Sequence, residues 1–156
     1  MYAAVLPRTW DPRAKSLVLQ RETLCSSQIT LNLARPTPWD VGDRRQVRDN
    51  YGQENAIKRT LLPRLQIDLP YELVPEATIE ELFTGKGGWE QLYTTYPGSF
   101  GLMIVSAVGF DQSKSKAMVF IVHKGGPAYG SGGYHFLAKQ ADGRWIQAFE
   151  KLVFVS

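Results

Sequence analysis

The sequence predicts an α+β domain: an antiparallel β-meander at its C-terminal end, preceded by a layer of helices. After Gly98, four segments rich in β-branched and aromatic residues follow one another across short connections, and connections of that length join antiparallel neighbours. Before Gly98, apolar residues recur mainly at helical spacing. The 156 residues fit one domain able to bury a sizeable core. We expect N-terminal strands and a connector in residues 1–40, helices in 41–98 and the meander in 99–156.

Composition excludes several kinds of site. Apolar residues make up 44% of the chain and charged residues 21%, which is ordinary globular usage. Cys25 is the only cysteine, so an intrachain disulfide is excluded, and two histidines are too few for the common zinc patterns. The net charge of +3 is too small to indicate a nucleic-acid partner by itself. The sequence therefore predicts no metal site and no cofactor.

Membrane and export signals are not evident. No stretch approaches the roughly 18–20 apolar residues of a membrane-spanning helix. The opening, MYAAVLPRTWDPRAK, lacks the charged start and apolar run of a signal peptide. The compartment stays open, because a cytoplasmic protein and an exported protein whose leader has been removed both fit.

The N-terminal half mixes strand and helix signals. Residues 16–20 and 28–34 have the pattern of short strands, and a proline-punctuated connector follows at 35–40. A helix is predicted over 43–62, with Pro63 ending it.

Two shorter helices are predicted after an extended segment. Residues 65–74 have a proline interruption that suits an edge strand. Thr78 and Glu81 form a capping-box pattern at the start of a helix over 76–83. A second short helix is predicted over 89–96.

The meander is predicted to form a sheet covered on both faces. Its two central runs are apolar at successive positions, which is typical of buried strands. With two or three helices over one face, the cone-shaped arrangement of cystatins or nuclear transport factors is one architecture that fits, and such folds hold a pocket between helix and sheet. N-terminal strands would extend the sheet to five or six strands. The four runs are 100–110, 116–124, 132–140 and 144–156.

The last strand predicts which of its aromatic side chains face the core. By strict alternation, Trp145, Gln147 and Phe149 share one face, and Glu150 marks the opposite face as solvent-facing. Trp145 should therefore be buried, and its truncation to alanine should cost about 3–5 kcal/mol.

The stretch KGGPAYGSGGYHF, residues 124–136, contains five glycines. It matches neither the dinucleotide-binding nor the Walker glycine pattern, and it leads into a strand-like segment instead of a helix. We interpret it as a long hairpin loop centred near Ala128 and Tyr129. The functional alternative is a contact loop with Tyr129 at its tip.

The position of that loop centre predicts where the two histidines lie relative to each other. It would place His123 roughly opposite Tyr134 or His135 across the hairpin. Two imidazoles with a carboxylate such as Asp111 or Glu150 could bind a metal or serve a small-molecule enzyme. No motif fixes the carboxylate in place, so a surface or hydrogen-bonded imidazole pair is the favoured interpretation.

A Ser–His–acid set can also be written as Ser106, His135 and Glu150. Ser106 lies mid-strand, however, without the sharp turn that exposes a nucleophilic serine. Packing in the interior is the favoured interpretation for both Ser106 and Cys25.

Concentrated positive charge occurs on the first predicted helix, at Arg44, Arg45, Arg48 and Arg59. Arginine-rich helix faces can grip a phosphate backbone. Acidic residues are interleaved with these arginines, so a solvated helix face is the favoured interpretation and nucleic acid is a disfavoured partner.

Residues 70–156 carry a set of short motifs: a Gly-Trp pair, a Tyr-Pro-Gly-Ser-x-Gly segment, a Ser-x-Val-Gly-Phe strand, a glycine-rich strand that runs into Tyr134 and a closing Gly-x-Trp. This set resembles a group of small, functionally uncharacterised bacterial proteins, whose members often have cysteines in the glycine loop, where this chain has none. The resemblance implies no activity, and motifs of glycine, proline and aromatic residues usually specify a fold. Gly109, for example, is expected at a bulge or a close approach. The shared residues are Trp89, Tyr96, Pro97, Gly98, Ser99, Gly101, Ser106, Val108, Gly109, Phe110, Gly132, Tyr134 and Trp145.

These observations favour a non-enzymatic binding or interaction module that meets a small molecule or a protein at a helix/sheet pocket or at the glycine loop. The alternatives are an enzyme that uses His123 or His135 with a carboxylate, and a nucleic-acid binder that uses the Arg44–Arg59 face. A homodimer also stays open. The residues expected to contact a ligand are His123, Tyr129, Tyr134 and His135.

Overall fold

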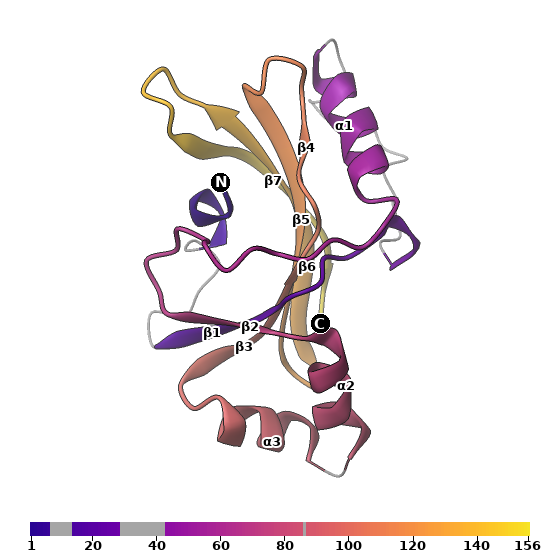
Figure 1. Ribbon diagram of the computed structural model, residues 1–156, viewed down its shortest axis with the longest axis vertical. Coiled ribbons are helices and arrows are strands. Elements are labelled where there is room, and N and C mark those ends of the chain that lie inside the picture. The colour runs from indigo at the N-terminus through magenta and orange to yellow at the C-terminus, as the bar shows by residue number, and fades with distance from the viewer. Residues whose placement is uncertain (7–13, 29–42, 86) are drawn as a thin grey trace.

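The computed structural model describes residues 1–6, 14–28, 43–85 and 87–156. The predicted strand at 28–34, apart from Gln28, and the connector at 35–40 lie outside this part. A seven-stranded mixed sheet organises the described chain, in the order β2-β1-β3-β5-β6-β7 with β4 beside β5 (Figure 1). The strands are β1 (Ser16–Gln20), β2 (Tyr71–Val74), β3 (Ser99–Val105), β4 (Gly109–Phe110), β5 (Lys116–Gly126), β6 (Tyr129–Lys139) and β7 (Trp145–Val155). The helices are α1 (Asp43–Glu54), α2 (Glu76–Thr84) and α3 (Gly88–Thr95), with 3-10 turns η1 (Tyr2–Ala4) and η3 (Ser26–Gln28).

The α+β prediction and the antiparallel meander are confirmed. β3, β5, β6 and β7 pair antiparallel in chain order, with β4 adding a short ladder to β5. β1 pairs in parallel with both β2 and β3, and the crossover from β1 to β2 contains α1. Parallel neighbours are joined by such long crossovers, so the partners of β1 lie far from it in the sequence. The local hydrophobic pattern therefore did not predict that β1 lies between β2 and β3.

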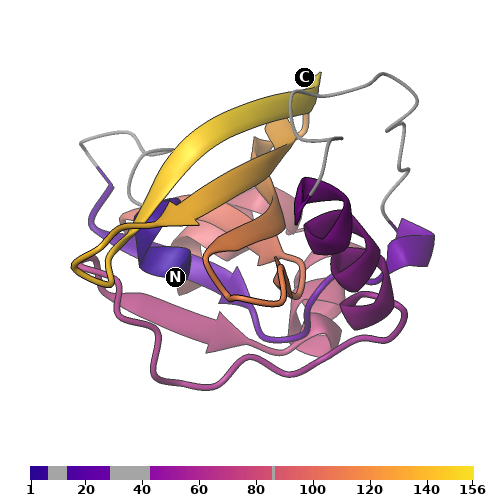
Figure 2. The same cartoon turned by 90° about the horizontal axis from the view of Figure 1, so that it is seen from above.

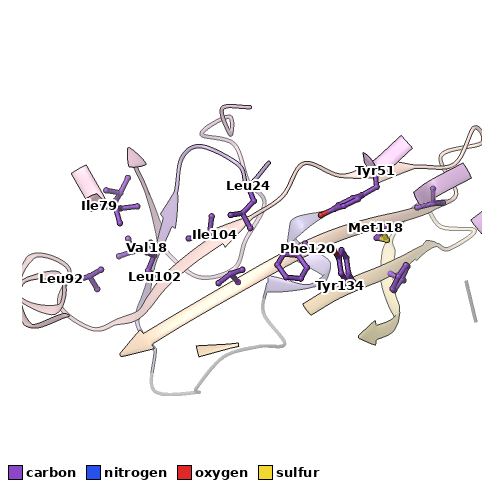
Figure 3. Close-up of a cluster of buried hydrophobic side chains, with 14 residues drawn as sticks. Val18, Leu24, Tyr51, Ile79, Leu92, Leu102, Ile104, Met118, Phe120 and Tyr134 are labelled. Atoms are coloured by element: carbon purple, nitrogen blue, oxygen red, sulfur yellow. The ribbon is translucent and has the colours of Figure 1, made fainter. Parts of the chain in front are cut away.

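The three helices cover one face of the sheet, which we call the helix face. α1 contributes Val47 and Tyr51 to its core, α2 contributes Ile79 and α3 contributes Leu92. Figure 3 shows Tyr51, Ile79 and Leu92 beside the side chains of the sheet, with Phe120 in the middle of the cluster. Helices over one face were expected from the sequence.

The opposite face is covered by the N-terminal turn η1 and by the irregular segment before β2. Val5 and Leu6, at the end of η1, are fully buried there, and Leu61 joins them from the segment that leads to β2. Figures 1 and 2 show η1 and α1 on opposite sides of the sheet. The two central strands of the predicted meander, β5 and β6, are therefore buried on both faces over most of their length, as their apolar runs predicted.

Gly109 lies where α1 approaches β4, as expected of a close-approach glycine. A Cβ atom on Gly109 would come within 2.4 Å of the Cα of Tyr51, a distance that side chains do not tolerate. The Asn50 side chain also accepts a hydrogen bond from the Phe110 N–H at 2.7 Å. α1 is therefore fixed against β4 at backbone contact.

The prediction for the first helix was too long. α1 ends at Glu54, because Asn55 turns out of the helix and its buried amide bonds to Ala107 on the sheet side. Ile57, within the predicted helix, lies beyond its observed end and is 62% exposed.

The second helix has the predicted bounds to within a residue but a different cap. Neither Thr78 nor Glu81 makes a capping-box bond at its start. Instead the Glu22 carboxylate accepts a hydrogen bond from the Glu76 N–H at 2.7 Å. The helix is therefore capped by a carboxylate from another segment, and not by Thr78 as the local sequence predicted.

The predicted alternation in the last strand is wrong. Phe149 lies opposite Phe136, but Gln147 lies opposite Leu137, so β7 has an extra residue at this point. Such a bulge reverses the faces of all side chains beyond it. Trp145 consequently packs against Phe110 on the face opposite the helices, while Phe149 packs against Phe136 on the helix face. Both side chains are half-buried.

No helix in the described part of the chain is long and apolar enough to cross a membrane.

Candidate functional site

A cleft of about 780 Å³ opens on the helix face of the sheet. Side chains of β3 and β5 form its floor, α2 and the start of α3 form one wall, and the end of β7 forms the other. Small-molecule pockets have volumes of this order and mostly apolar linings. The apolar side chains that define it include Leu102, Ile104, Phe120 and Val122 on the floor and Phe83 and Phe154 on the walls.

The glycine-rich stretch forms one end of this cleft. β5 continues to Gly126 and β6 begins at Tyr129, so only Pro127 and Ala128 connect them. The long loop expected from the glycines is therefore a tight hairpin, and its glycines lie in paired strands. Gly126, Pro127, Tyr129 and Gly130 line the cleft. The predicted pocket and the predicted contact loop thus coincide in space.

Aromatic side chains hold the hairpin tip in place. The Tyr93 hydroxyl of α3 donates a hydrogen bond to the Gly125 carbonyl at 2.8 Å. His123 stacks on Phe100 with ring centroids 4.3 Å apart, and the Tyr129 ring meets His123 edge-on at 5.6 Å.

The protonation state of His123 follows from this packing. Burial lowers the pKa of His123, although the bond to the Phe100 carbonyl opposes the shift. At 2.6 Å from that carbonyl, the Nε2 atom of a neutral ring must carry the proton and donate it. His123 is therefore a neutral packing and hydrogen-bonding group at neutral pH.

Two glycines allow close contacts beside the cleft. A Cβ atom on Gly132 would lie 2.3 Å from the Phe154 ring, so the missing side chain lets Phe154 lie across β6 and form a wall. Gly101 has a φ of +92° and faces the Lys124 carbonyl, which a Cβ atom would approach to 2.3 Å. Only glycine combines that backbone conformation with that contact.

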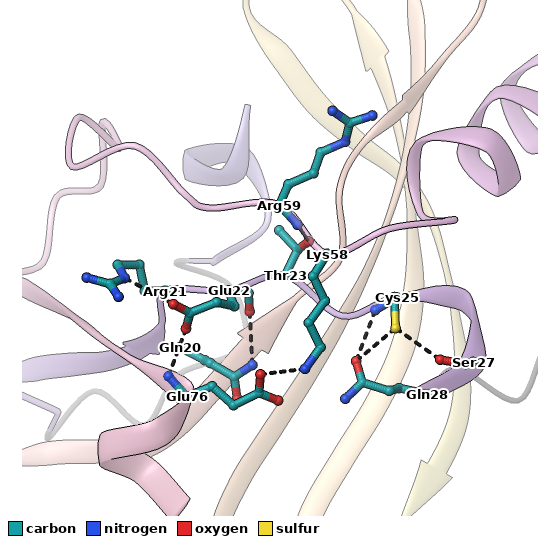
Figure 4. Close-up of polar contacts among 10 residues, drawn as sticks. All are labelled: Gln20, Arg21, Glu22, Thr23, Cys25, Ser27, Gln28, Lys58, Arg59 and Glu76. Atoms are coloured by element: carbon teal, nitrogen blue, oxygen red, sulfur yellow. Dashed lines mark hydrogen bonds and ion pairs between the residues drawn. The ribbon is translucent and has the colours of Figure 1, made fainter.

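A polar cluster marks the other end of the cleft (Figure 4). Lys58 makes an ion pair with Glu76, and the buried Gln20 donates a hydrogen bond to the Glu22 carbonyl at 2.9 Å. Burial alone would raise the pKa of Glu22, but hydrogen bonds from the Glu76 N–H and from Arg21 outweigh it and lower that pKa. These bonds join the start of α2 to the chain that follows β1.

Cys25 lies at the edge of this cluster and is not buried, contrary to the expectation of interior packing. Its sulfur is 3.0 Å from the Ser27 hydroxyl and 3.4 Å from the Gln28 side-chain oxygen. The Ser27 hydrogen bond is the main reason why the pKa of the thiol is lowered. Gln28 itself lines the cleft.

The structure brings together two of the four expected ligand contacts. Tyr129 lines the cleft and touches His123. Tyr134 is fully buried between Tyr51 and Phe120 on the helix face, outside the cleft lining. His135, the next residue of β6, points to the opposite face.

The two histidines do not face each other across the hairpin. His123 pairs with Ser131 and His135 pairs with Val119, because the tight turn shifts the register by several residues. Four residues of β6 separate His135 from Ser131, or about 13 Å. The fully buried His135 instead bonds to Gln147 at 3.0 Å, with Glu150 3.9 Å from its Nε2 atom.

The remaining catalytic candidates are occupied by structural bonds. Ser106 is fully buried, its hydroxyl donating to the Ala107 carbonyl and accepting from the Phe120 N–H. The Asp111 carboxylate binds Ser113 and Ser115 in its own turn. Among the residues that the structure describes, no three His, Cys, Asp or Glu residues form a group that could hold a metal ion.

The four arginines are not on one helix face. Arg45 is exposed on α1 and Arg48 is half-buried beside Tyr134, where its charge partly offsets the rise that burial causes in the tyrosine's pKa. Arg59 lies beyond the end of α1 and pairs with Glu54 at 2.7 Å. The Arg44 side chain lies outside the described residues.

Sequence reasoning did not identify the wall residues Trp89 and Phe154 or the polar residue Lys124 as site residues. Trp89 has the spacing of a buried helix position, and Phe154 lies near the end of the last strand. These residues line the same cleft only because distant segments meet, as in the hydrogen bond between Tyr93 and Gly125.

No family model matches the chain, and no curated protein or solved structure is similar enough to indicate a relationship.

Proposed function

We propose that this protein is a non-enzymatic binding module whose ligand lies in the cleft between α2, α3 and the sheet. The observation that carries the proposal is the apolar cleft of about 780 Å³ with the glycine hairpin at one end. An apolar ligand would remove both its own surface and the cleft lining from water, which favours binding by about 25 cal/mol per Å².

The lining favours binding over catalysis. The histidines and Ser106 are committed to structural contacts outside it, and the acidic side chains of the described lining are Glu76 and Glu80, on one wall. A catalytic set needs a nucleophile or base with an orienting partner. The lining residues instead offer surface and scattered hydrogen-bonding groups.

Binding of an uncharged apolar probe, such as dodecanol or Nile red, tests the proposal. Phe154→Ala should weaken binding by about tenfold, since it removes an aromatic wall. Val155→Ala is the matched control, because Val155 is 71% exposed and does not line the cleft. Absence of binding to the parent protein, or equal effects of the two substitutions, would refute the cleft as the site.

A further inference from the structure

The hairpin end of the cleft carries hydrogen-bond donors that lack acceptors. Lys124 lines the cleft from β5 as an exposed residue, and its ammonium makes no hydrogen bond or ion pair with any described residue. Trp89 lines it from α3, and its indole N–H is likewise without an acceptor in the described chain. Both groups can only donate, so they can be satisfied only by water or by an acceptor on a ligand.

These donors belong to the same end of the cleft. The Tyr93 hydroxyl reaches the carbonyl of Gly125, the residue next to Lys124. Trp89 lies one helical turn before Tyr93, with the two ring centroids 6.2 Å apart. Trp89 and Lys124 therefore flank the place where α3 meets the hairpin.

The acidic side chains of the lining lie at its α2 wall, where Lys58 pairs with one of them. Lys58 pairs with Glu76, and the pKa of Lys58 is raised mainly by that hydrogen bond and, to a smaller extent, by the charge of Glu80. Glu76 and Glu80 thus lie on the α2 wall of the cleft, close to Lys58. Lys124 is the one cation among the described lining residues, and it has no such partner.

We propose that the ligand is an amphiphile with an apolar body and a single anionic head, a carboxylate or a phosphate, held at Lys124 and Trp89. This inference rests on the proposed binding function and names its ligand class. The apolar body lies on the floor formed by Leu102, Ile104 and Phe120. Charge complementarity selects the anionic head over an uncharged or cationic one.

Four probes with the same chain and different heads test the ligand class: dodecanoate, dodecyl phosphate, dodecanol and dodecylammonium, each titrated below its micelle-forming concentration. The two anions should bind about tenfold tighter than dodecanol, as expected for a charge-assisted hydrogen bond, and dodecylammonium should bind weakest. The ratio of dodecanoate to dodecyl phosphate affinity distinguishes a fatty-acid-like ligand from a phospholipid-like one.

Two substitutions assign the head site. Lys124→Met should abolish the preference for the anions while leaving dodecanol binding within about twofold, and Trp89→Phe should reduce the preference by about threefold. Lys139→Met is the matched control, since Lys139 is an exposed lysine at the far end of β6. Thermal melting of each variant confirms that it is folded.

The outcomes separate this inference from the function it rests on. If no probe binds, the proposed function fails with it. If all four bind equally, if dodecylammonium binds tightest, or if Lys124→Met keeps the anion preference, the cleft remains a binding site and the anionic head is refuted.

Discussion

Asp111 closes the turn between β4 and β5 with its carboxylate. The carboxylate accepts hydrogen bonds from the N–H groups of Ser115 and Lys116 and from the hydroxyls of Ser113 and Ser115. Burial alone would raise the pKa of Asp111, but these bonds favour the charged form and lower it to about 2. The ordinary value is 3.8, so the native state holds this carboxylate ionised in acid where the unfolded state does not.

We predict that Asp111→Asn loses about 2 kcal/mol of unfolding free energy at pH 7, from about 1.4 kcal/mol for each unit of pKa shift. Because the pKa is lowered in the folded state, the stabilisation is fully present at pH values above the pKa of the unfolded state. It is lost as the pH falls through the pKa of the folded state. The difference between parent and variant should therefore shrink between about pH 4 and pH 2. Urea unfolding at several pH values measures it.

Asp49→Asn is the control for this series, because Asp49 is exposed on α1. It should leave the unfolding free energy nearly unchanged at every pH. A gap between Asp111→Asn and the parent that stays constant down to pH 2 would show that charge is not the cause.

Among the elements, α1 depends on one buried side chain at its end. Asn55 is fully buried, donates to the Tyr51 and Ala107 carbonyls, and accepts from the Ala107 N–H. Ala107 lies between β3 and β4, where the strand is interrupted. The amide therefore joins the helix end to the break in the sheet.

Asn55→Ala should cost about 2 kcal/mol, since it leaves the buried N–H of Ala107 without a partner, while the Ala107 carbonyl keeps the Ser106 hydroxyl. Chemical denaturation measures this loss. Gln53→Ala, on the exposed side of the same helix, should stay within about 0.5 kcal/mol of the parent. A small loss for Asn55→Ala would mean that water replaces the amide.

The bulge in β7 gives a second prediction at this scale. Trp145 and Phe149 pack on opposite faces of the sheet, about 13 Å apart along the strand. Each is half-buried, so truncation to alanine should cost about 2 kcal/mol, less than the loss for a fully buried aromatic residue. The two losses should add in the double variant, because the side chains share no neighbours. Strong coupling in a double-mutant cycle would place both on one face.

At the scale of the whole molecule, the sheet is held between two cores with different coverings. Helices cover one face, while η1 and the chain before β2 cover the other. The N-terminal residues therefore belong to the core, with Val5 and Leu6 fully buried.

Leu6→Ala should cost about 3 kcal/mol, as expected for a leucine truncated in a packed interior. Leu62→Ala is the matched control, because Leu62 is 75% exposed, and it should change stability by less than about 0.5 kcal/mol. Urea denaturation compares the two. Equal small effects would show that the N-terminal turn is not part of the folded core.

The elements were predictable where local pattern decides them. The four runs after Gly98 and the two short helices before it have the expected bounds to within a few residues, because β-branched runs and helical stripes record burial directly. The errors lie where another segment intervenes: Asn55 ends α1 by bonding to Ala107, and Glu22 caps α2 from a distance.

The candidate site was predicted in part. The glycine stretch and a pocket between helix and sheet were both expected, and Tyr129 lines the cleft. The facing of His123 and His135 was wrong, because the turn at Pro127 and Ala128 sets the register of β6. A shift of a few residues in register changes every pair across a hairpin.

The sequence by itself determined the fold class, the meander and the burial of its central strands, since each follows from spacings within a few residues. Only the tertiary structure decided the cleft. Its floor, walls and donors come from β3, α2, α3, the hairpin and the end of β7, and their meeting depends on strand order, on the bulge in β7 and on glycines at contacts such as Gly132 with Phe154. These are contacts between distant segments, and a local pattern carries no record of which distant segment a residue will meet.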